Sequence, residues 1–314
     1  MNNKRIEYID IAKGLLILLV VIGHVQQNEP FTLLKQFIYT FHMPAFFIIS
    51  GILFDKSRTA NKKFFPYVKK KIYTLIIPYF FFEILSGIVF YMAYSGNYSN
   101  IKGIIVNAIT MECNLTPDWF LPTLFIVDVM AYIEVNAKSK TISILLFVLS
   151  FASMFLSYDN HYIIVIQRML VSYVFFVVGQ YLRTFTGYFN YIWCFVSLAV
   201  TTIVAFTNGT VGIYSCTYNN ALLFFIGSLA GSIFILSLSR IVNHSKTLSY
   251  LGINSLVVMS THYVILRLAE NCLNIDCTIY INSFIVFVMI VVLEPVLIFV
   301  MNKFAPFLIG KSRH

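Results

Sequence analysis

The sequence predicts an all-α protein, a polytopic membrane helical bundle of about ten transmembrane helices. Of its 314 residues, 59% are hydrophobic and 11% are charged, and the mean hydropathy is +0.81. These values lie far outside the range of soluble domains. Several apolar stretches reach the roughly 20 residues that a helix needs to cross a bilayer. We therefore expect one integral membrane domain over residues 1–314, with no appended soluble domain.

Apolar runs separated by charged or turn-forming residues divide the chain into ten expected spans. The first run follows basic residues, as a signal peptide does. However, "VQQNEP" comes after it without a small-residue cleavage pattern, so we expect the run to be retained. A long basic segment, 55–71, separates the second span from the third. The spans are 11–27, 36–54, 72–94, 118–135, 141–157, 162–182, 188–207, 221–238, 248–267 and 279–302.

Basic residues are distributed unevenly between the two sides of these spans. With the N-terminus in the cytoplasm, 18 of the 22 Lys and Arg residues lie on the cytoplasmic side or at its interface. Because positively charged loops stay in the cytoplasm, this bias predicts a multi-pass protein of the inner (cytoplasmic) membrane with both termini inside. The net charge of +9 is then a topology signal. Lipid headgroups are the expected partners of the basic loops, and nucleic acid is not expected.

The cysteines give no indication of a metal site. Five are present, and their spacing matches no set of metal ligands, so no metal is expected. A disulfide between Cys272 and Cys277 is one alternative, and unpaired small residues are the other. The five cysteines are Cys113, Cys194, Cys216, Cys272 and Cys277.

A few ionisable residues fall at membrane depth, where each costs several kcal/mol unless it finds partners or lines a cavity. His24, His42 and Arg168 lie near the outer ends of the first, second and sixth spans, and His262 lies about two thirds of the way outward along the ninth. Depth alone therefore gathers them in the outer half of the bundle. The structural alternative for a lone membrane histidine is a hydrogen bond between helices.

Four carboxylates accompany these groups. Glu83, Asp128 and Glu294 lie nearer the middle of their spans and are candidate partners for the buried cations. Glu294 precedes a proline, which favours a role in satisfying a helix break. Asp118 precedes Trp119, which favours a helix cap beside an interfacial aromatic residue.

The first span has polar groups at both ends of one face. Lys13 and His24 are 11 residues apart, so both project from the same side of a helix, about 16 Å apart along its axis. Asp10 lies three residues before Lys13, where it can pair with the lysine or cap the helix. A linear ligand with an anionic head in the cytosol and a reactive tail matches this layout.

Five motifs follow one another in an order that resembles the membrane-bound acyltransferase 3 family. Lys13, ten intervening residues and His24 resemble that family's basic-x10-His motif, and the style of the opening resembles the branch of fucose 4-O-acetylase and related sugar O-acetyltransferases. Lysine in place of arginine keeps the charge but loses the bidentate fork for a phosphate. The motifs are "DIAKGLLILLVVIGH", "FHMPAFFIISGILF", "KKKIYTLIIPYF", "DWFLPTLF" and "LSYLGINSLVVMSTHYVI".

The resemblance implies acyl transfer from cytosolic acyl-CoA, most often acetyl-CoA, to a hydroxyl of a cell-surface or lipid-linked glycan on the outer side. His24 is then the general base, with an acyl-histidine intermediate as the variant. Arg168 or His42 would stabilise the oxyanion, and His42 is preferred because it lies within a motif. His262 and Trp119 are further candidates for binding the substrate or the oxyanion.

The donor site is expected at the cytoplasmic face. Lys13, Lys70 and Lys71 would hold the phosphates of CoA there, and a plain positive-inside anchor is the alternative for the lysine run. The rival functions are a transporter or exporter of a glycolipid or small solute, and a pH sensor. Neither rival explains a basic residue and a histidine on one stripe together with the other motifs in order.

Overall fold

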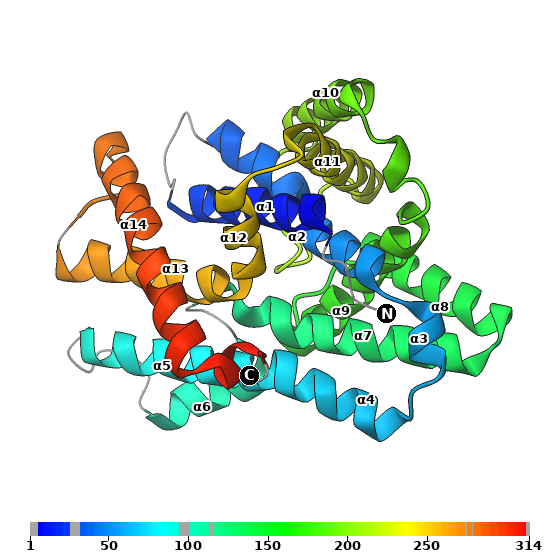
Figure 1. Ribbon diagram of the computed structural model, residues 1–314, viewed down its shortest axis with the longest axis horizontal. Coiled ribbons are helices and arrows are strands. Elements are labelled where there is room, and N and C mark those ends of the chain that lie inside the picture. The colour runs from blue at the N-terminus through cyan, green and yellow to red at the C-terminus, as the bar shows by residue number, and fades with distance from the viewer. Residues whose placement is uncertain are drawn as a thin grey trace.

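The computed structural model describes residues 6–25, 32–93, 101–112, 116–273, 275–277 and 279–311, and it confirms the all-α membrane fold (Figure 1). In this part of the chain there is no β-strand. The helices are α1 Glu7–Val25, α2 Thr32–Leu53, α3 Lys56–Ala60, α4 Phe64–Lys71, α5 Ile77–Ala93, α6 Ile101–Thr110, α7 Phe120–Ala137, α8 Lys140–Ala152, α9 His161–Leu182, α10 Tyr191–Asn208, α11 Ala221–Val242, α12 Lys246–Ile253, α13 Ser255–Cys272 and α14 Tyr280–Phe304. The short helical turns are η1 Ile72–Ile76, η2 Pro117–Trp119, η3 Ser153–Phe155, η4 Thr186–Tyr188 and η5 Pro306–Ile309.

Eight helices in the described ranges are long and apolar enough to cross a membrane, and a bent pair, α12 with α13, adds a ninth candidate. The expected span 141–157 corresponds to the shorter apolar helix Lys140–Phe155. The eight are α1, α2, α4 with η1 and α5 (Phe64–Ala93), η2 with α7 (Pro117–Ala137), α9, α10, α11 and α14.

The expected span 248–267 corresponds to the bent pair α12 and α13. It bends by 82° between α12 and α13. The helix is interrupted at Asn254, which has φ −108° and ψ 16°, and the Asn254 amide oxygen accepts hydrogen bonds from Asn302 (2.9 Å) and Lys311 (2.8 Å). Before the bend, α12 packs along the start of α1. Because Gly252 lies against the backbone of Asp10, a Cβ would not fit there.

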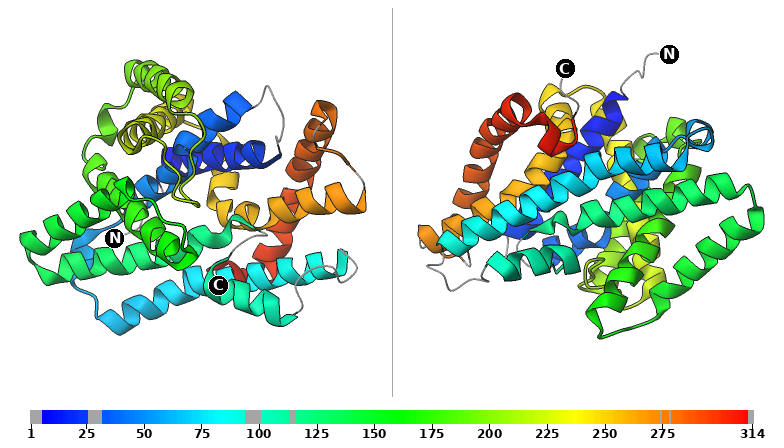
Figure 2. Two further views of the ribbon diagram at one scale, coloured as in Figure 1. Left: turned by 180° about the vertical axis from the view of Figure 1, so that it is seen from behind. Right: turned by 90° about the horizontal axis from the view of Figure 1, so that it is seen from below.

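Two segments expected to be loops contain helices. The basic segment 55–71 forms α3 and α4, and α4 continues through the π-helical η1 into α5 as one long element (Figure 2). A single π turn inside a helix often lies at a functional site. The connection between the expected spans 72–94 and 118–135 contains α6, which packs on α5. There the Tyr79 hydroxyl donates to the Ala108 carbonyl at 2.7 Å.

The helices α1 and α2 form the centre of the bundle. α1 packs against α2, α11, α12, α13 and α14, and α2 packs against α9, α10 and α11. Two glycines allow α2 and α9 to cross in backbone contact, because a Cβ on Gly51 would meet the Phe176 carbonyl and one on Gly179 would meet the Ile48 carbonyl. Gly51 and Gly179 therefore permit this close packing.

The start of α1 and the C-terminal η5 lie on the same side of the molecule (Figure 2). Gly310 ends η5 with a φ of +71° and lies against the backbone of Thr74 in η1. Lys311 follows it and reaches the bend at Asn254. The described C-terminal segment therefore covers the same end of the bundle at which α1 begins.

Candidate functional site

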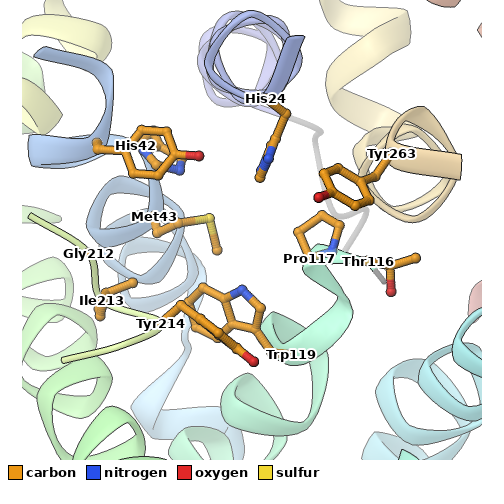
Figure 3. Close-up of a pocket in the computed structure, with 11 residues that line it drawn as sticks. His24, His42, Met43, Thr116, Pro117, Trp119, Gly212, Ile213, Tyr214 and Tyr263 are labelled. Carbon is orange, nitrogen blue, oxygen red and sulfur yellow. The ribbon is translucent and has the colours of Figure 1, made fainter. Parts of the chain in front are cut away.

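A cavity of about 290 Å³ lies where the end of α1 meets α2 and α13 (Figure 3). Two irregular segments close it from the other sides: Thr116 to Trp119, and the loop containing Gly212 to Tyr214. Its size is at the lower end of the range for small-ligand sites. The cavity is walled mainly by aromatic residues, with two histidines among them.

His24 lies in the last turn of α1, and its imidazole points into this cavity (Figure 3). The ring centroids of His262 and Tyr263 are each 5.3 Å from that of His24, and the centroid of Tyr39 is at 6.2 Å. The rest of α1 is mostly apolar and buried, so the helix fixes the direction of the side chain at its end.

His42 lines the same cavity from α2. Its Nδ1 donates to the Ile38 carbonyl at 2.8 Å, since a carbonyl oxygen can only accept. When the ring is neutral, its Nε2 is therefore an acceptor. Pro44, two residues on, has no N–H and leaves the Thr40 carbonyl without its helical donor, and Ser228 of α11 donates to that carbonyl at 2.7 Å. This bond ties α2 to α11 close to His42.

His262 is fully buried on α13, beside His24. Its Nδ1 donates to the Val258 carbonyl at 2.6 Å, so the neutral ring presents Nε2 as an acceptor. Among the described residues, Nε2 has no hydrogen-bond partner. The structure thus brings together three histidines that the sequence places only by depth, and the neutral rings of two of them offer a lone pair on Nε2.

Trp119 forms the wall of the cavity opposite His24, and its indole nitrogen faces the cavity (Figure 3). Tyr214 packs beside it, with ring centroids 5.8 Å apart. Arg168 lies behind this wall. Its guanidinium carbon is 5.2 Å from the Trp119 ring and 4.2 Å from the Tyr214 ring, and its Nε donates to the Tyr214 carbonyl at 2.8 Å. Arg168 therefore supports the wall and is not among the described residues that line the cavity.

Comparison with known protein families matches residues 6–301 to the acyltransferase domain of one family, so the match covers nearly the whole chain. The chain belongs to the acyltransferase 3 family. The resemblance carried by the motifs is thereby confirmed, and the multi-pass fold agrees with a membrane acyltransferase.

One curated relative of this acyltransferase 3 protein is the nodulation protein NolL of Mesorhizobium japonicum. The two are 39% identical over 88 residues, which make up 26% of this chain and 23% of NolL. The matched region therefore spans about a quarter of that relative's length. No solved structure matches the chain.

At the opposite end of the bundle, this acyltransferase 3 protein has a groove of about 1190 Å³. Lys70, Lys303 and Lys311 line it together with Thr74 of the π turn. Lys71 points elsewhere and forms a 2.6 Å ion pair with Asp128. Of the two neighbouring lysines predicted to bind the donor, Lys70 therefore lines the groove and Lys71 does not.

Lys13 lies in the first half of α1 and is not among the described residues that line this groove. It pairs with Asp10 at 3.0 Å, as one of the two sequence interpretations predicted. The Asp10 backbone packs on Gly252, two residues before Asn254, which binds Lys311. The basic end of α1 and the groove therefore meet at the α12–α13 bend.

The buried carboxylates pair with residues other than the histidines and Arg168, which they were expected to accompany. The Thr261 hydroxyl donates to Glu294 at 2.7 Å, and α14 continues past Glu294 without a break. Asp128 binds Lys71. The expectation that Asp118 caps a helix is wrong, because its carboxylate lies between the hydroxyls of Ser260 at 2.5 Å and Thr116 at 2.9 Å.

Glu83 and Asp118 share one hydroxyl. The Thr116 oxygen lies 2.8 Å from Glu83 and 2.9 Å from Asp118, and all three side chains are buried. A hydroxyl has a single hydrogen, so Thr116 can donate fully to only one of the two carboxyl groups at a time. This network holds the Thr116–Trp119 wall against α5 and α13.

The described cysteines, Cys194, Cys216, Cys272 and Cys277, are free, and Cys113 lies outside the described residues. The alternative of unpaired cysteines is therefore the correct one for Cys272 and Cys277. Burial raises the pKa of the Cys216 thiol in the loop that closes the cavity. The described part of the chain contains no group of three or more His, Cys, Asp or Glu residues that could hold a metal ion.

Tyr263 is the main cavity residue that the sequence interpretation missed. It directly follows His262, and Arg267 lies four residues later on the same helical face. The guanidinium of Arg267 donates to the Tyr263 hydroxyl at 2.6 Å. Tyr263 lies in the late motif and Arg267 lies two residues beyond its end, and this i, i+4 spacing is the signal that could have identified the pair.

Proposed function

We propose that this protein is an O-acyltransferase that moves an acyl group, with acetyl as the first candidate, from cytosolic acyl-CoA to a glycan hydroxyl. The acceptor would be a cell-surface or lipid-linked sugar that binds in the cavity on the extracytoplasmic side. One observation carries the proposal: a single helix, α1, joins the basic end at Lys13 to an imidazole that points into a cavity lined by aromatic residues.

His24 would act as the general base. The acceptor oxygen attacks the thioester carbonyl carbon while His24 takes the hydroxyl proton, and the departing CoA thiolate then receives that proton. A positioned base typically contributes about 10² to 10⁴-fold to such a step. The indole and phenol faces around the imidazole suit the apolar faces of a sugar ring, and the cavity volume suits one sugar unit with a short acyl group.

The donor head would bind at the opposite end. Lys70, Lys303 and Lys311 gather three positive charges in one groove. Phosphate groups of CoA are the natural partners of such a cluster. Lys311 also binds Asn254 at the α12–α13 bend, and Gly252 of α12 packs on the backbone of Asp10 in α1.

Lys13 and Lys71 are each held in an ion pair, by Asp10 and Asp128, and only Lys70 of the three lines the groove. We therefore assign the first CoA contact to Lys70, keep Lys13 as a second contact on the strength of the family motif, and leave Lys71 with a structural role.

The test compares cells that lack the gene and are complemented with the wild-type protein, with His24→Ala, or with His244→Ala as a matched control. His244 is an exposed histidine that pairs with Glu7, away from the cavity. Ester-linked acetate on the envelope glycan is measured by mass spectrometry, and the amount of protein in the membrane is measured in parallel. We expect acetylation by His24→Ala to be at least about 10²-fold lower than by the wild type, and acetylation by His244→Ala to equal that of the wild type.

Two results would contradict the proposal. One is normal acetylation by His24→Ala when the variant protein is present at its usual level. The other is movement of an unmodified substrate across vesicles that contain the purified wild-type protein but no acyl-CoA, which would favour the transporter.

A further inference from the structure

The proposed reaction needs a hydrogen-bond donor for the carbonyl oxygen of the thioester. When the acceptor oxygen attacks the thioester carbon, a new C–O bond forms and the π electrons of the C=O bond move onto the carbonyl oxygen, which becomes the oxyanion. The bound oxyanion then collapses, the C–S bond breaks, and the thiolate takes the proton from His24. Removing a donor that stabilises such an oxyanion typically costs about 10² to 10³-fold in kcat.

The two groups first expected to stabilise the oxyanion, His42 and Arg168, do not suit this role. The Nδ1–H of His42 is used by the Ile38 carbonyl, so its neutral ring offers only an acceptor to the cavity. The guanidinium of Arg168 is covered by Trp119 and Tyr214 and held by the Tyr214 carbonyl. The oxyanion donor must therefore come from another residue of the cavity wall.

We propose that the hydroxyl of Tyr263, polarised by Arg267, is the donor that stabilises the oxyanion. Tyr263 lines the cavity with its ring centroid 5.3 Å from that of His24, and its oxygen faces the cavity beside the imidazole (Figure 3). The inference rests on the proposed acyl transfer and names a catalytic residue that was not among the candidates expected from the sequence.

The direction of the hydrogen bonds supports this role. A guanidinium only donates, so the Tyr263 oxygen is the acceptor in its 2.6 Å bond to Arg267, and its own hydrogen is left for a second acceptor. A cation on the oxygen makes the O–H a stronger donor. Glu270 in turn accepts from Arg267 at 2.8 Å and fixes its position, so Arg267 is a positioning residue.

Trp119 offers a second donor from the opposite wall. Its indole nitrogen faces the same space as the Tyr263 oxygen (Figure 3). Two donors that converge beside a base form the usual geometry for holding a tetrahedral intermediate. The protein thus supplies both groups from elements far apart in sequence, the η2 turn and α13.

The decisive variant is Tyr263→Phe, which removes one oxygen and keeps the ring. The purified protein in nanodiscs is given acetyl-CoA and envelope glycan from cells that lack the gene, and release of free CoA thiol is followed. We expect kcat to fall about 10² to 10³-fold with little change in the KM for either substrate. The matched control is Tyr79→Phe, which removes a buried 2.7 Å phenol-to-carbonyl bond away from the cavity and should keep the wild-type kcat.

Arg267 provides an independent test that leaves the cavity wall intact. Arg267→Gln should lower kcat about tenfold, and Arg267→Lys should recover part of the loss, because it keeps the positive charge behind the phenol. If Tyr263→Phe does not accumulate in the membrane, this pair of variants tests whether the Tyr263 hydroxyl stabilises the oxyanion.

The results also separate this inference from the proposed function. If the wild-type protein releases no CoA with the glycan present, both fail. If the wild type is active and His24→Ala is not, a wild-type kcat in Tyr263→Phe or in Arg267→Gln overturns the role of Tyr263 alone.

Discussion

The crossing of α2 and α9 depends on two glycines, and adding one methyl group there should destabilise the protein. A Cβ on Gly51 would meet the Phe176 carbonyl far inside the 3.4–4 Å of ordinary van der Waals contact, and one on Gly179 would meet the Ile48 carbonyl in the same way. The atoms that it meets belong to helix backbone, so no side chain can rotate away. The helices would have to separate by more than about 1 Å.

The expected cost of Gly51→Ala follows from this geometry. Forcing extra atoms into a packed core usually costs about 1–3 kcal/mol, and a rigid backbone neighbour favours the upper end. Alanine recovers at most about 1 kcal/mol through its better helix propensity. We therefore expect a net loss of about 1–2 kcal/mol. His42 lies on α2, so acyl transfer should fall as well.

The double variant sharpens the test. Once Gly51→Ala has moved the helices apart, Gly179→Ala meets a looser contact. The double variant should therefore lose less free energy of unfolding than the sum of the losses of the two single variants. The assay is thermal unfolding of the purified protein in one detergent. Gly187→Ala is the matched control, because a Cβ there would meet nothing within 4 Å. A melting temperature for Gly51→Ala equal to that of the control would refute the reasoning.

Two further predictions concern charged groups outside the cavity. Lys71→Met leaves the Asp128 carboxylate, which is 5% exposed, without its 2.6 Å partner, and it should lower the free energy of unfolding in detergent by about 3–5 kcal/mol. The double variant Lys71→Met with Asp128→Leu should recover most of this loss. Equal losses in the single and the double variant would contradict a buried ion pair. Asp55 caps α3, and hydrogen bonds from the Arg58 N–H and the Ser57 hydroxyl lower its pKa. The contribution of Asp55 to stability is therefore fully present above its pKa in the unfolded chain, about 3.9, and is lost as the pH falls through its lower pKa in the folded protein. Hydrogen-exchange protection of α3 should therefore drop in acid for the wild type and persist in Asp55→Asn, which caps without titrating; the same drop in both would exclude Asp55 as the cause.

Hydropathy and charge alone determined much of this protein. The apolar runs predict most of the membrane helices, because burial in lipid depends on the average polarity of a segment and hardly on its neighbours. Helical spacing alone predicted that Lys13 can pair with Asp10, since three residues place both on one face. The order of the motifs indicated the acyltransferase 3 family, which the match over residues 6–301 confirms.

Only the tertiary structure decided how these helices meet. The sequence gives the depth of His24 and His262 but not the rotation and crossing of their helices, which depend on contacts such as Gly252 with Asp10, about 240 residues apart. For the same reason it could not separate Lys70, which lines the groove, from its neighbour Lys71, which binds Asp128. Tyr263 is inconspicuous among the 20 tyrosines of the chain. The fold distinguishes it by setting its ring beside His24 and its oxygen on Arg267.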